Sequence, residues 1–309
     1  MAAAKLLLKA RPTPAQLADR LRPVDGLYPD GIELYLAAAD LADQSALDEI
    51  VARLNGARTP PEFAWLIEGP VDSLDGEDFD VTRESAADRL VVERLGQIAE
   101  RIGALAVNIH VISPSPDLRR LTLACRAELL DRAVPFLSSF VKTMQSVGAV
   151  PTIEHMPPVL RMRRDDFSFT PIGMASADFR YLVEWIPGLR VLVDTSHAGL
   201  YLNARRLSVD PSLAWSGPLK SYLAELPDES SDLIGFMAAF PALENAQISN
   251  AAGVLGEGLP YADGDFDLDP AMRWLNAQVR HIVTETLEAS NDDAVNMRAA
   301  LRRVRMALA

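Results

Sequence analysis

Short apolar runs alternate along the chain with longer segments that have helical spacing. The runs are rich in branched and aromatic residues and lack the helical period, which is typical of buried strands. We expect strands over residues 4–10, 31–36, 62–69, 104–112, 150–155, 189–195, 244–250 and 280–288.

The segments between these runs carry helix signals. "TPAQLADRLRPV" begins with a Thr cap and has Pro in its first turn. "SALDEIVARLNG" and "RESAADRLVVERLGQIAERIG" each end at a glycine stop. The last segment, "DDAVNMRAALRRVRMAL", is acidic at its start and basic toward its end, as the helix dipole favours. Strands and helices are therefore expected to alternate.

Eight such β–α units predict a (β/α)8 TIM barrel, with residues 1–309 forming a single domain. A doubly wound open sheet is the main alternative, but it usually has a Gly-rich turn after its first strand, where this chain has "KLLLKARPTP". Two long connections, 156–175 and 201–242, are expected to cover the C-terminal face of the barrel, and the second contains helical pieces.

Charge and cysteine content narrow the function classes. The chain has 43 acidic and 30 basic residues, a net charge of −13, so nucleic-acid and anionic-membrane partners are not expected. Its opening is too short and too charged for a secretory signal, and no apolar run is long enough to span a membrane. The single cysteine, Cys125, lies in a helical pattern, where we expect a buried, inert thiol. These features predict a cytoplasmic protein with a small-molecule substrate.

Rare polar residues fall at the predicted strand ends, which meet at one mouth in a closed barrel. Carboxylates gathered there would repel one another without a cation. An oxygen-rich set suits Mn²⁺ or Mg²⁺, with Co²⁺ or Zn²⁺ as alternatives. The candidate ligands are Glu154, Asp194, Gln247 and Glu285. His197, three residues after Asp194, would then bond a substrate oxygen or a bound water.

Each of these residues could instead be an ordinary polar group at a strand end. Glu33 lies within a strand, and we expect it to form an ion pair with Lys9. His281 lies at the opposite end of the last strand from Glu285, so we interpret it as structural.

Two further features have a functional and a structural interpretation. Arg161, Arg163 and Arg164 could clamp an anionic substrate, but a solvated charged loop is the favoured interpretation. Trp65 and Tyr201 could stack on a sugar face or pack in the core.

The chain resembles the xylose isomerase-like barrel superfamily, which contains sugar isomerases, epimerases, related dehydratases and metal-dependent apurinic endonucleases. The strongest match is "VDTSHAGL", which is similar to the family's Asp-x-x-His after strand six. The other matching stretches, in the family's order, are "GIELYL", "VNIHV", "TIEH", "AQISNA", "GEGLPYADGDFDL" and "IVTETLE".

The resemblance implies a divalent ion held by Glu154, Asp194 and Glu285, with Gln247 in the place of a fourth ligand that is usually His. It also implies that Glu154 and Glu285 act as base and acid, and that His197 contacts the substrate. Glu68 falls where the endonuclease branch has a metal-binding His. The candidates for substrate contact are His110, Glu68, His155, Arg161 and Trp65.

The resemblance therefore predicts a metal-dependent isomerase or epimerase that forms an enediolate from a polyhydroxylated substrate. A dehydratase or other lyase on the same scaffold is an alternative. A metal-free binding or regulatory barrel is another, favoured by Gln247 and Asn250. An apurinic endonuclease is disfavoured because the chain has only 4 histidines and a net charge of −13. The resemblance is compatible with a homodimer.

Overall fold

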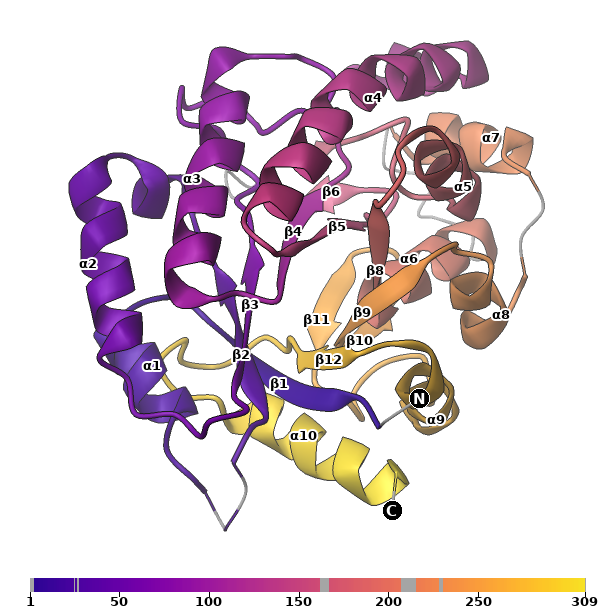
Figure 1. Cartoon of the computed structure of the whole chain (residues 1–309). Coiled ribbons are helices and arrows are strands. Elements are labelled where there is room, and N and C mark those ends of the chain that lie inside the picture. The colour runs from indigo at the N-terminus through magenta and orange to yellow at the C-terminus, as the bar shows by residue number, and fades with distance from the viewer. Residues whose placement is uncertain are drawn as a thin grey trace.

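The computed structural model describes residues 3–24, 26, 28–161, 167–206, 215–227 and 230–308. Eight parallel strands close into a barrel in the order β1-β12-β9-β8-β5-β4-β3-β2 (Figure 1). These are β1 (Lys5–Ala10), β2 (Gly31–Tyr35), β3 (Ala64–Glu68), β4 (Ala106–His110), β5 (Val150–Glu154), β8 (Arg190–Asp194), β9 (Leu243–Ile248) and β12 (His281–Thr284). The predicted (β/α)8 barrel is confirmed, and each strand lies within a predicted range or within one residue of it.

Helices surround the barrel and connect its strands (Figure 1). They are α1 (Pro14–Arg20), α2 (Gln44–Asn55), α3 (Ala86–Ile102), α4 (Leu123–Ser146), α5 (Ser176–Trp185), α6 (Thr195–Arg206), α7 (Ser216–Glu225), α8 (Leu233–Ala238), α9 (Leu268–Gln278) and α10 (Val295–Leu308), with 3₁₀ turns at Ala38–Leu41 and Leu118–Arg120. The Thr13 side chain accepts the N–H of Gln16 and caps α1, as its sequence predicts. None of the described helices is long and apolar enough to cross a membrane. Cys125 in α4 is half-buried rather than buried.

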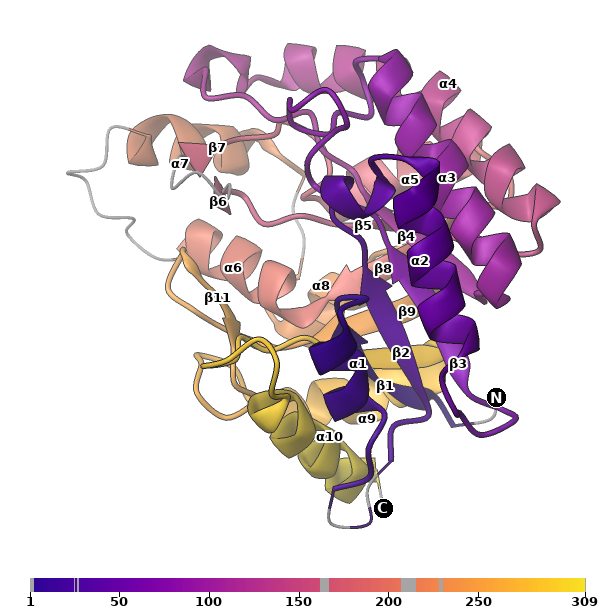
Figure 2. The ribbon, with the colours of Figure 1, turned by 90° about the vertical axis from the view of Figure 1, so that its left-hand side faces the viewer.

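Two small antiparallel hairpins follow the carboxyl ends of barrel strands. β6 (Leu160–Arg161) pairs with β7 (Phe167–Ser168) after β5, and β10 (Asn250–Ala252) pairs with β11 (Gly256–Leu259) after β9. Figure 2 shows both on one side of the barrel, together with α6 and α7. The connection over 201–242 contains the end of α6 and both α7 and α8, which confirms its predicted helical pieces.

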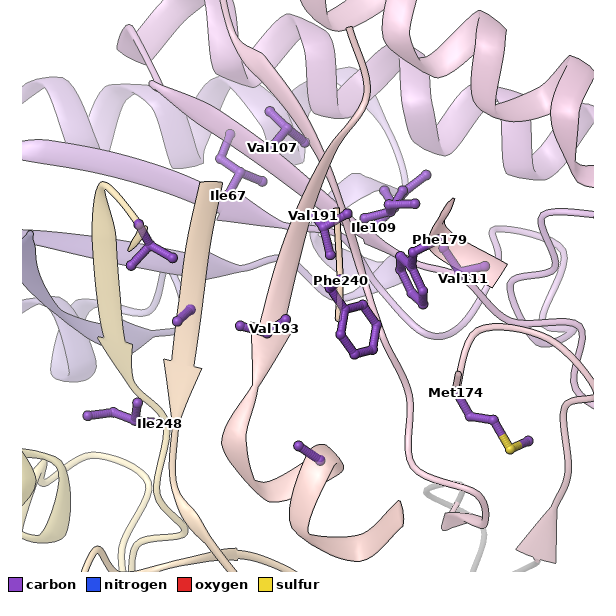
Figure 3. Packing of buried hydrophobic residues seen from close by; sticks show 14 of the residues in the cluster. Ile67, Val107, Ile109, Val111, Met174, Phe179, Val191, Val193, Phe240 and Ile248 are labelled. Carbon is purple, nitrogen blue, oxygen red and sulfur yellow. The ribbon is translucent and has the colours of Figure 1, made fainter. Parts of the chain in front are cut away.

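Alternating side chains divide each strand between two cores. The outward residues join the large core between barrel and helices, where Ile67, Val107 and Val191 pack near Phe179 and Phe240 (Figure 3). The inward residues form a small separate cluster inside the barrel, with Leu7, Ala64, Leu66, Ala106 and Val283. On β1, β3 and β12 this apolar cluster ends two residues before Lys9, Glu68 and Glu285.

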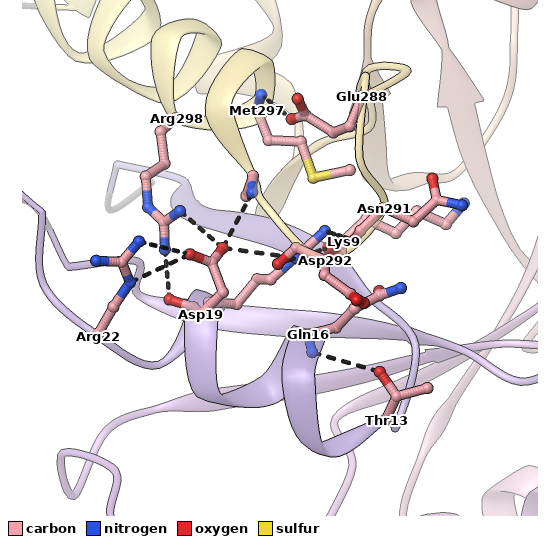
Figure 4. Close-up of polar contacts among 12 residues, drawn as sticks. Lys9, Thr13, Gln16, Asp19, Arg22, Glu288, Asn291, Asp292, Met297 and Arg298 are labelled. Atoms are coloured by element: carbon pink, nitrogen blue, oxygen red, sulfur yellow. Dashed lines mark hydrogen bonds and ion pairs between the residues drawn. The ribbon is translucent and has the colours of Figure 1, made fainter.

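A buried charged cluster joins α1 to α10 (Figure 4). Asp19 accepts hydrogen bonds from Arg298 Nη1 at 2.8 Å, from the Ala294 N–H at 3.0 Å and from Arg22 Nη2 at 3.0 Å. The buried Arg20 donates to the backbone oxygens of Asn291 and Asp292. This Asp19 cluster anchors the last helix of the chain to the first.

Candidate active site

A pocket of about 460 Å³ opens at the carboxyl ends of the strands. A second pocket of about 390 Å³ adjoins it and shares Lys9, His197, Glu257 and Glu285. The polar residues that line the first pocket are Lys9, Arg11, Gln16, Arg20, Tyr35, Glu68, His110, Glu154, His197, Glu257, Glu285, Thr286, Glu288 and Asn291. The two pockets form the candidate active site.

Strand alternation explains why these side chains face the same space. Leu7 belongs to the inner apolar cluster, so Lys9, two residues later, points into the barrel one level higher. The same step leads from Leu66 to Glu68 on β3 and from Val283 to Glu285 just after β12. On these three strands a polar residue at the mouth therefore follows an apolar inward residue.

The ammonium group of Lys9 lies between the carboxylates of Glu68 and Glu285 and forms an ion pair with each. The predicted pair between Lys9 and Glu33 is wrong, because Glu33 accepts the amide of Gln247 at 2.6 Å instead. Burial alone would lower the pKa of Lys9, but Glu285 and Glu68 hold that pKa well above its usual value. The two carboxylates thus favour the charged form of Lys9 within the mouth.

Gln247 is fully buried beside these carboxylates. Its Nε2 donates to Glu33 Oε2 at 2.6 Å and to Glu68 Oε2 at 2.7 Å. Its Oε1 has no hydrogen-bond partner within the described part of the chain. The side chain therefore serves as a donor to two carboxyl groups.

Glu68, His110 and Glu154 form a second group, on the neighbouring strands β3, β4 and β5. His110 Nε2 lies 3.4 Å from Glu68 Oε1 and 3.6 Å from Glu154 Oε2. Asn108 Nδ2 donates to Glu154 Oε2 at 2.6 Å. Burial raises the pKa of Glu154 to about 7, although His110 opposes the shift. Glu154 is therefore a carboxyl group that can hold or release a proton near neutral pH.

His197 joins three carboxylates at the other side of the mouth. Its backbone N–H donates to Asp194 Oδ1 at 2.7 Å, and its Nε2 lies 3.2 Å from Glu257 Oε1. Its Nδ1 lies 2.8 Å from the His155 carbonyl oxygen and 3.3 Å from Glu154 Oε1. Burial opposes the charge, but Asp194 and Glu257 raise the pKa of His197 well above its usual value. Asp194 and Glu257 therefore favour the imidazolium form of His197.

Several solved structures have a similar fold. A D-tagatose 3-epimerase-like protein is 13% identical with a TM-score of 0.63, covering 98% of each chain. The 3-keto-D-glucoside 4-epimerase YcjR from E. coli is 14% identical with a TM-score of 0.60, covering 98% of this chain and 99% of that one. A xylose isomerase domain protein from Planctomyces limnophilus is 10% identical with a TM-score of 0.57, covering 99% and 96%. The chain has the xylose isomerase-like TIM-barrel fold.

At these identities the likeness shows the fold alone. No protein-family model and no curated protein matches the sequence. The resemblance that the strand-end motifs indicated is thus confirmed for the barrel fold.

The mouth of this xylose isomerase-like barrel brings together most of the predicted site residues. Glu68, His110, Glu154, His197 and Glu285 line the first pocket, and Asp194 lines the second. Within the described residues, two groups place three ligand atoms within 4.8 Å of one another: Glu68–His110–Glu154 and Glu33–Glu68–Glu285.

The predicted carboxylate ligands Glu154, Asp194 and Glu285 do not form such a group among the described residues. Glu285 meets Lys9, and Asp194 accepts the backbone N–H of His197. Glu154 and Glu285 each belong to one of the two groups, but to different ones, and Asp194 belongs to neither.

The remaining predicted contacts lie elsewhere. His155 is fully buried among Phe179, Phe236 and Phe240, and its Nδ1 accepts the Asp194 N–H. It therefore supports the strand end behind the pocket and lines neither pocket.

Two aromatic candidates pack in the core. Trp65 packs edge-on against Phe63 and lines neither pocket of the mouth, and Tyr201 stacks on Phe236. Arg161 begins the hairpin beside the pocket, at the end of β6. Its side chain, Arg163 and Arg164 lie outside the described residues.

Sequence reasoning missed the site roles of Lys9 and Glu257. Glu257 lies on β11 between two glycines, and its carboxylate reaches the imidazole of His197. A lone acid in the short "GEG" strand was the available signal. For Lys9, the signal was a lysine at an inward position directly after three leucines in β1.

Proposed function

We propose that the protein is an isomerase or epimerase of a sugar, sugar acid or cyclitol that moves a proton at a carbon beside a carbonyl. The observation that carries this proposal is Glu154, a buried carboxyl group on the pocket wall with a pKa raised by burial to about 7. Such a group can both take and return a proton at working pH. Burial also raises the pKa of Glu285, a second carboxyl group on the same pocket.

The residues present fit a divalent ion at Glu68, His110 and Glu154. Separations of 3.4 and 3.6 Å from His110 Nε2 to the two carboxylate oxygens suit ligands that share one ion. Two carboxylates favour Mn²⁺ or Mg²⁺, and the imidazole keeps Co²⁺ or Zn²⁺ as alternatives. A bound ion would supply Lewis acidity toward a substrate carbonyl.

The chain's own side chains provide acid–base and electrostatic groups around the pocket. We assign proton removal and return to Glu154 and Glu285, which come from non-adjacent strands, β5 and β12. The His197 imidazolium and the Lys9 ammonium supply positive charge for the oxygen that becomes negative during proton removal.

Proton return decides the product. Return to the opposite face of the same carbon gives epimerisation, and return to the neighbouring carbon gives isomerisation. Loss of a β-hydroxyl group would instead make the enzyme a dehydratase, and its product would be lighter by one water.

The test is hydrogen–deuterium exchange at carbon: the protein is incubated in deuterated water with a panel of keto-sugars, inososes and their acids. Wild-type protein supplied with Mn²⁺ should introduce deuterium at the reacting carbon, read by mass spectrometry and NMR. Glu154→Gln should slow exchange by about 100-fold or more. Glu244→Gln is the control, because Glu244 pairs with Arg280 at the far end of β9. No exchange with any member of the panel would contradict the proposal.

A further inference from the structure

Three carboxyl groups form a second group at the mouth, which shares only Glu68 with the Glu68–His110–Glu154 group. Glu33, Glu68 and Glu285 come from β2, from β3 and from the residue after β12, and they place one oxygen each within 4.8 Å of one another. Glu33 and Glu68 are buried, and the Glu285 side chain is one-third exposed. Such a group is expensive to bury unless a cation lies among its members.

Lys9 already provides that cation. β1 lies between β12 and β2 in the barrel, and the register pairs Lys9 with Glu33 and Leu8 with Thr284, so Lys9 lies beside Glu285 as well. Its Nζ forms ion pairs with Glu68 and Glu285, and its charge also opposes the rise in the pKa of Glu33. The ammonium thus lies among the oxygens that would otherwise hold an ion.

Gln247 is an independent indication of the same arrangement. Its buried amide donates to Glu33 and Glu68, two of the three carboxyl groups, while its own Oε1 is without a partner among the described residues. This neutral amide reaches Glu33 and Glu68 across the barrel from β9 and donates hydrogen bonds to them without adding charge. Lys9 and Gln247 together supply the positive charge and hydrogen bonds that the Glu33–Glu68–Glu285 group needs.

We propose that Lys9 is a built-in cation that takes the place of a divalent ion in the Glu33–Glu68–Glu285 group. The natural protein therefore binds no ion there, and Glu285 is kept for proton transfer rather than for metal binding. The assignment of Glu285 rests on the proposed function, whereas the position of the cation does not.

The experiment counts Mn²⁺ ions per chain by calorimetric titration and electron paramagnetic resonance after chelator treatment. Lys9→Met keeps an unbranched side chain and removes the charge. It should bind one Mn²⁺ more than the wild-type chain. Lys5→Met is the matched control on the same strand, because the Lys5 ammonium donates to the Glu62 carbonyl at the exposed end of β1. Equal ion counts in all three proteins would overturn the proposal.

Folding of the variant is itself informative. If Lys9→Met folds in the presence of Mn²⁺ but not in its absence, the result supports the proposal, because the ion would then replace the ammonium group. If Lys9→Met folds under neither condition, Glu285→Gln in the presence of Lys9 decides the question.

Wild-type and Glu285→Gln chains should bind Mn²⁺ equally, or both should bind none. Loss of an ion from Glu285→Gln would show that Glu285 is a ligand and would overturn the proposal. His110→Ala should weaken any wild-type site by about tenfold or more, which confirms that the titration detects ligand loss. Because these are binding measurements, absent deuterium exchange would count against the proposed function and leave this inference standing.

Discussion

Two buried charged clusters lie on either side of β1, and they are balanced in opposite ways. The carboxylate of Asp19 is held by Arg298, Arg22 and the N–H of Ala294, and these bonds overcome burial and lower its pKa. At the mouth, carboxyl groups outnumber cations, and burial raises the pKa of Glu33 to about 8 and that of Glu154 to about 7.

The difference separates a structural cluster from a functional one. Both carboxylate oxygens of Asp19 accept hydrogen bonds, Oδ2 from Arg298 and the Ala294 N–H and Oδ1 from Arg22 (Figure 4). The charge of Asp19 is therefore satisfied within the protein. The mouth keeps incompletely neutralised groups facing a pocket, which is the usual condition for proton transfer or metal binding. Arg20 connects the two regions, because its Nε lies 3.3 Å from the Lys9 carbonyl oxygen and its side chain lines the first pocket.

Replacement of Asp19 should have the largest effect on stability. Asp19→Asn leaves the buried Arg298 and Arg20 without a counter-charge, and we expect the free energy of unfolding to fall by about 3–5 kcal/mol. Guanidinium unfolding followed by circular dichroism measures the change. Arg22→Ala is the control, because the Arg22 side chain is 63% exposed and its loss should cost less than about 1 kcal/mol. Equal losses in both variants would mean that Asp19 is not the centre of the cluster.

Lowering the pH should destabilise the folded protein through His281, which lies at the amino end of β12. Burial lowers the pKa of His281 to about 4, from 6.5, and its Nδ1 lies 2.8 Å from Asn245 Oδ1. Between pH 6.5 and 4, His281 is therefore protonated more readily in the unfolded state than in the folded state. Its contribution to stability is complete above pH 6.5 and is lost as the pH falls from 6.5 to 4. The loss should reach about 3 kcal/mol.

Unfolding measured at pH 7, 5.5 and 4 tests this assignment. His281→Gln should flatten the decline between pH 6.5 and 4, and a decline equal to that of the wild-type chain would assign the acid sensitivity to other groups.

Replacement of Glu33 should have the smallest effect on stability, in contrast to replacement of Asp19. At pH 7 Glu33 is largely protonated, so Glu33→Gln replaces one neutral acceptor for the Gln247 amide with another. The free energy of unfolding should change by less than about 1 kcal/mol. Chemical denaturation at pH 7 measures it, and a loss as large as that of Asp19→Asn would show that Glu33 is ionised and needed by Lys9.

Much of the fold was predictable because its signals are local. The apolar runs predicted all eight barrel strands, and Thr13 and the glycine stops predicted helix ends. In parallel strands joined by helices, the carboxyl ends must meet at one face, so Glu68, His110 and Glu154 could be placed together before any coordinates.

The pairing within the mouth was not predictable in the same way. Lys9 was the expected partner of Glu33 because a Glu buried within a strand needs a counter-charge, but the Lys9 ammonium reaches Glu68 and Glu285 instead. Trp65 was a candidate for sugar stacking, and only the packing shows it against Phe63.

The sequence by itself determined the barrel, the inward-facing polar layer and the strand ends that supply it. These follow from a two-residue side-chain period and from parallel connections, both of which are properties of each strand and its neighbour in the chain. Only the tertiary structure decided which carboxyl group meets Lys9, which accepts the Gln247 amide and which reaches His197 from the β10–β11 hairpin. Those choices depend on distances of a few ångströms between residues remote in sequence, where small differences in reach and burial change the partner of a charge.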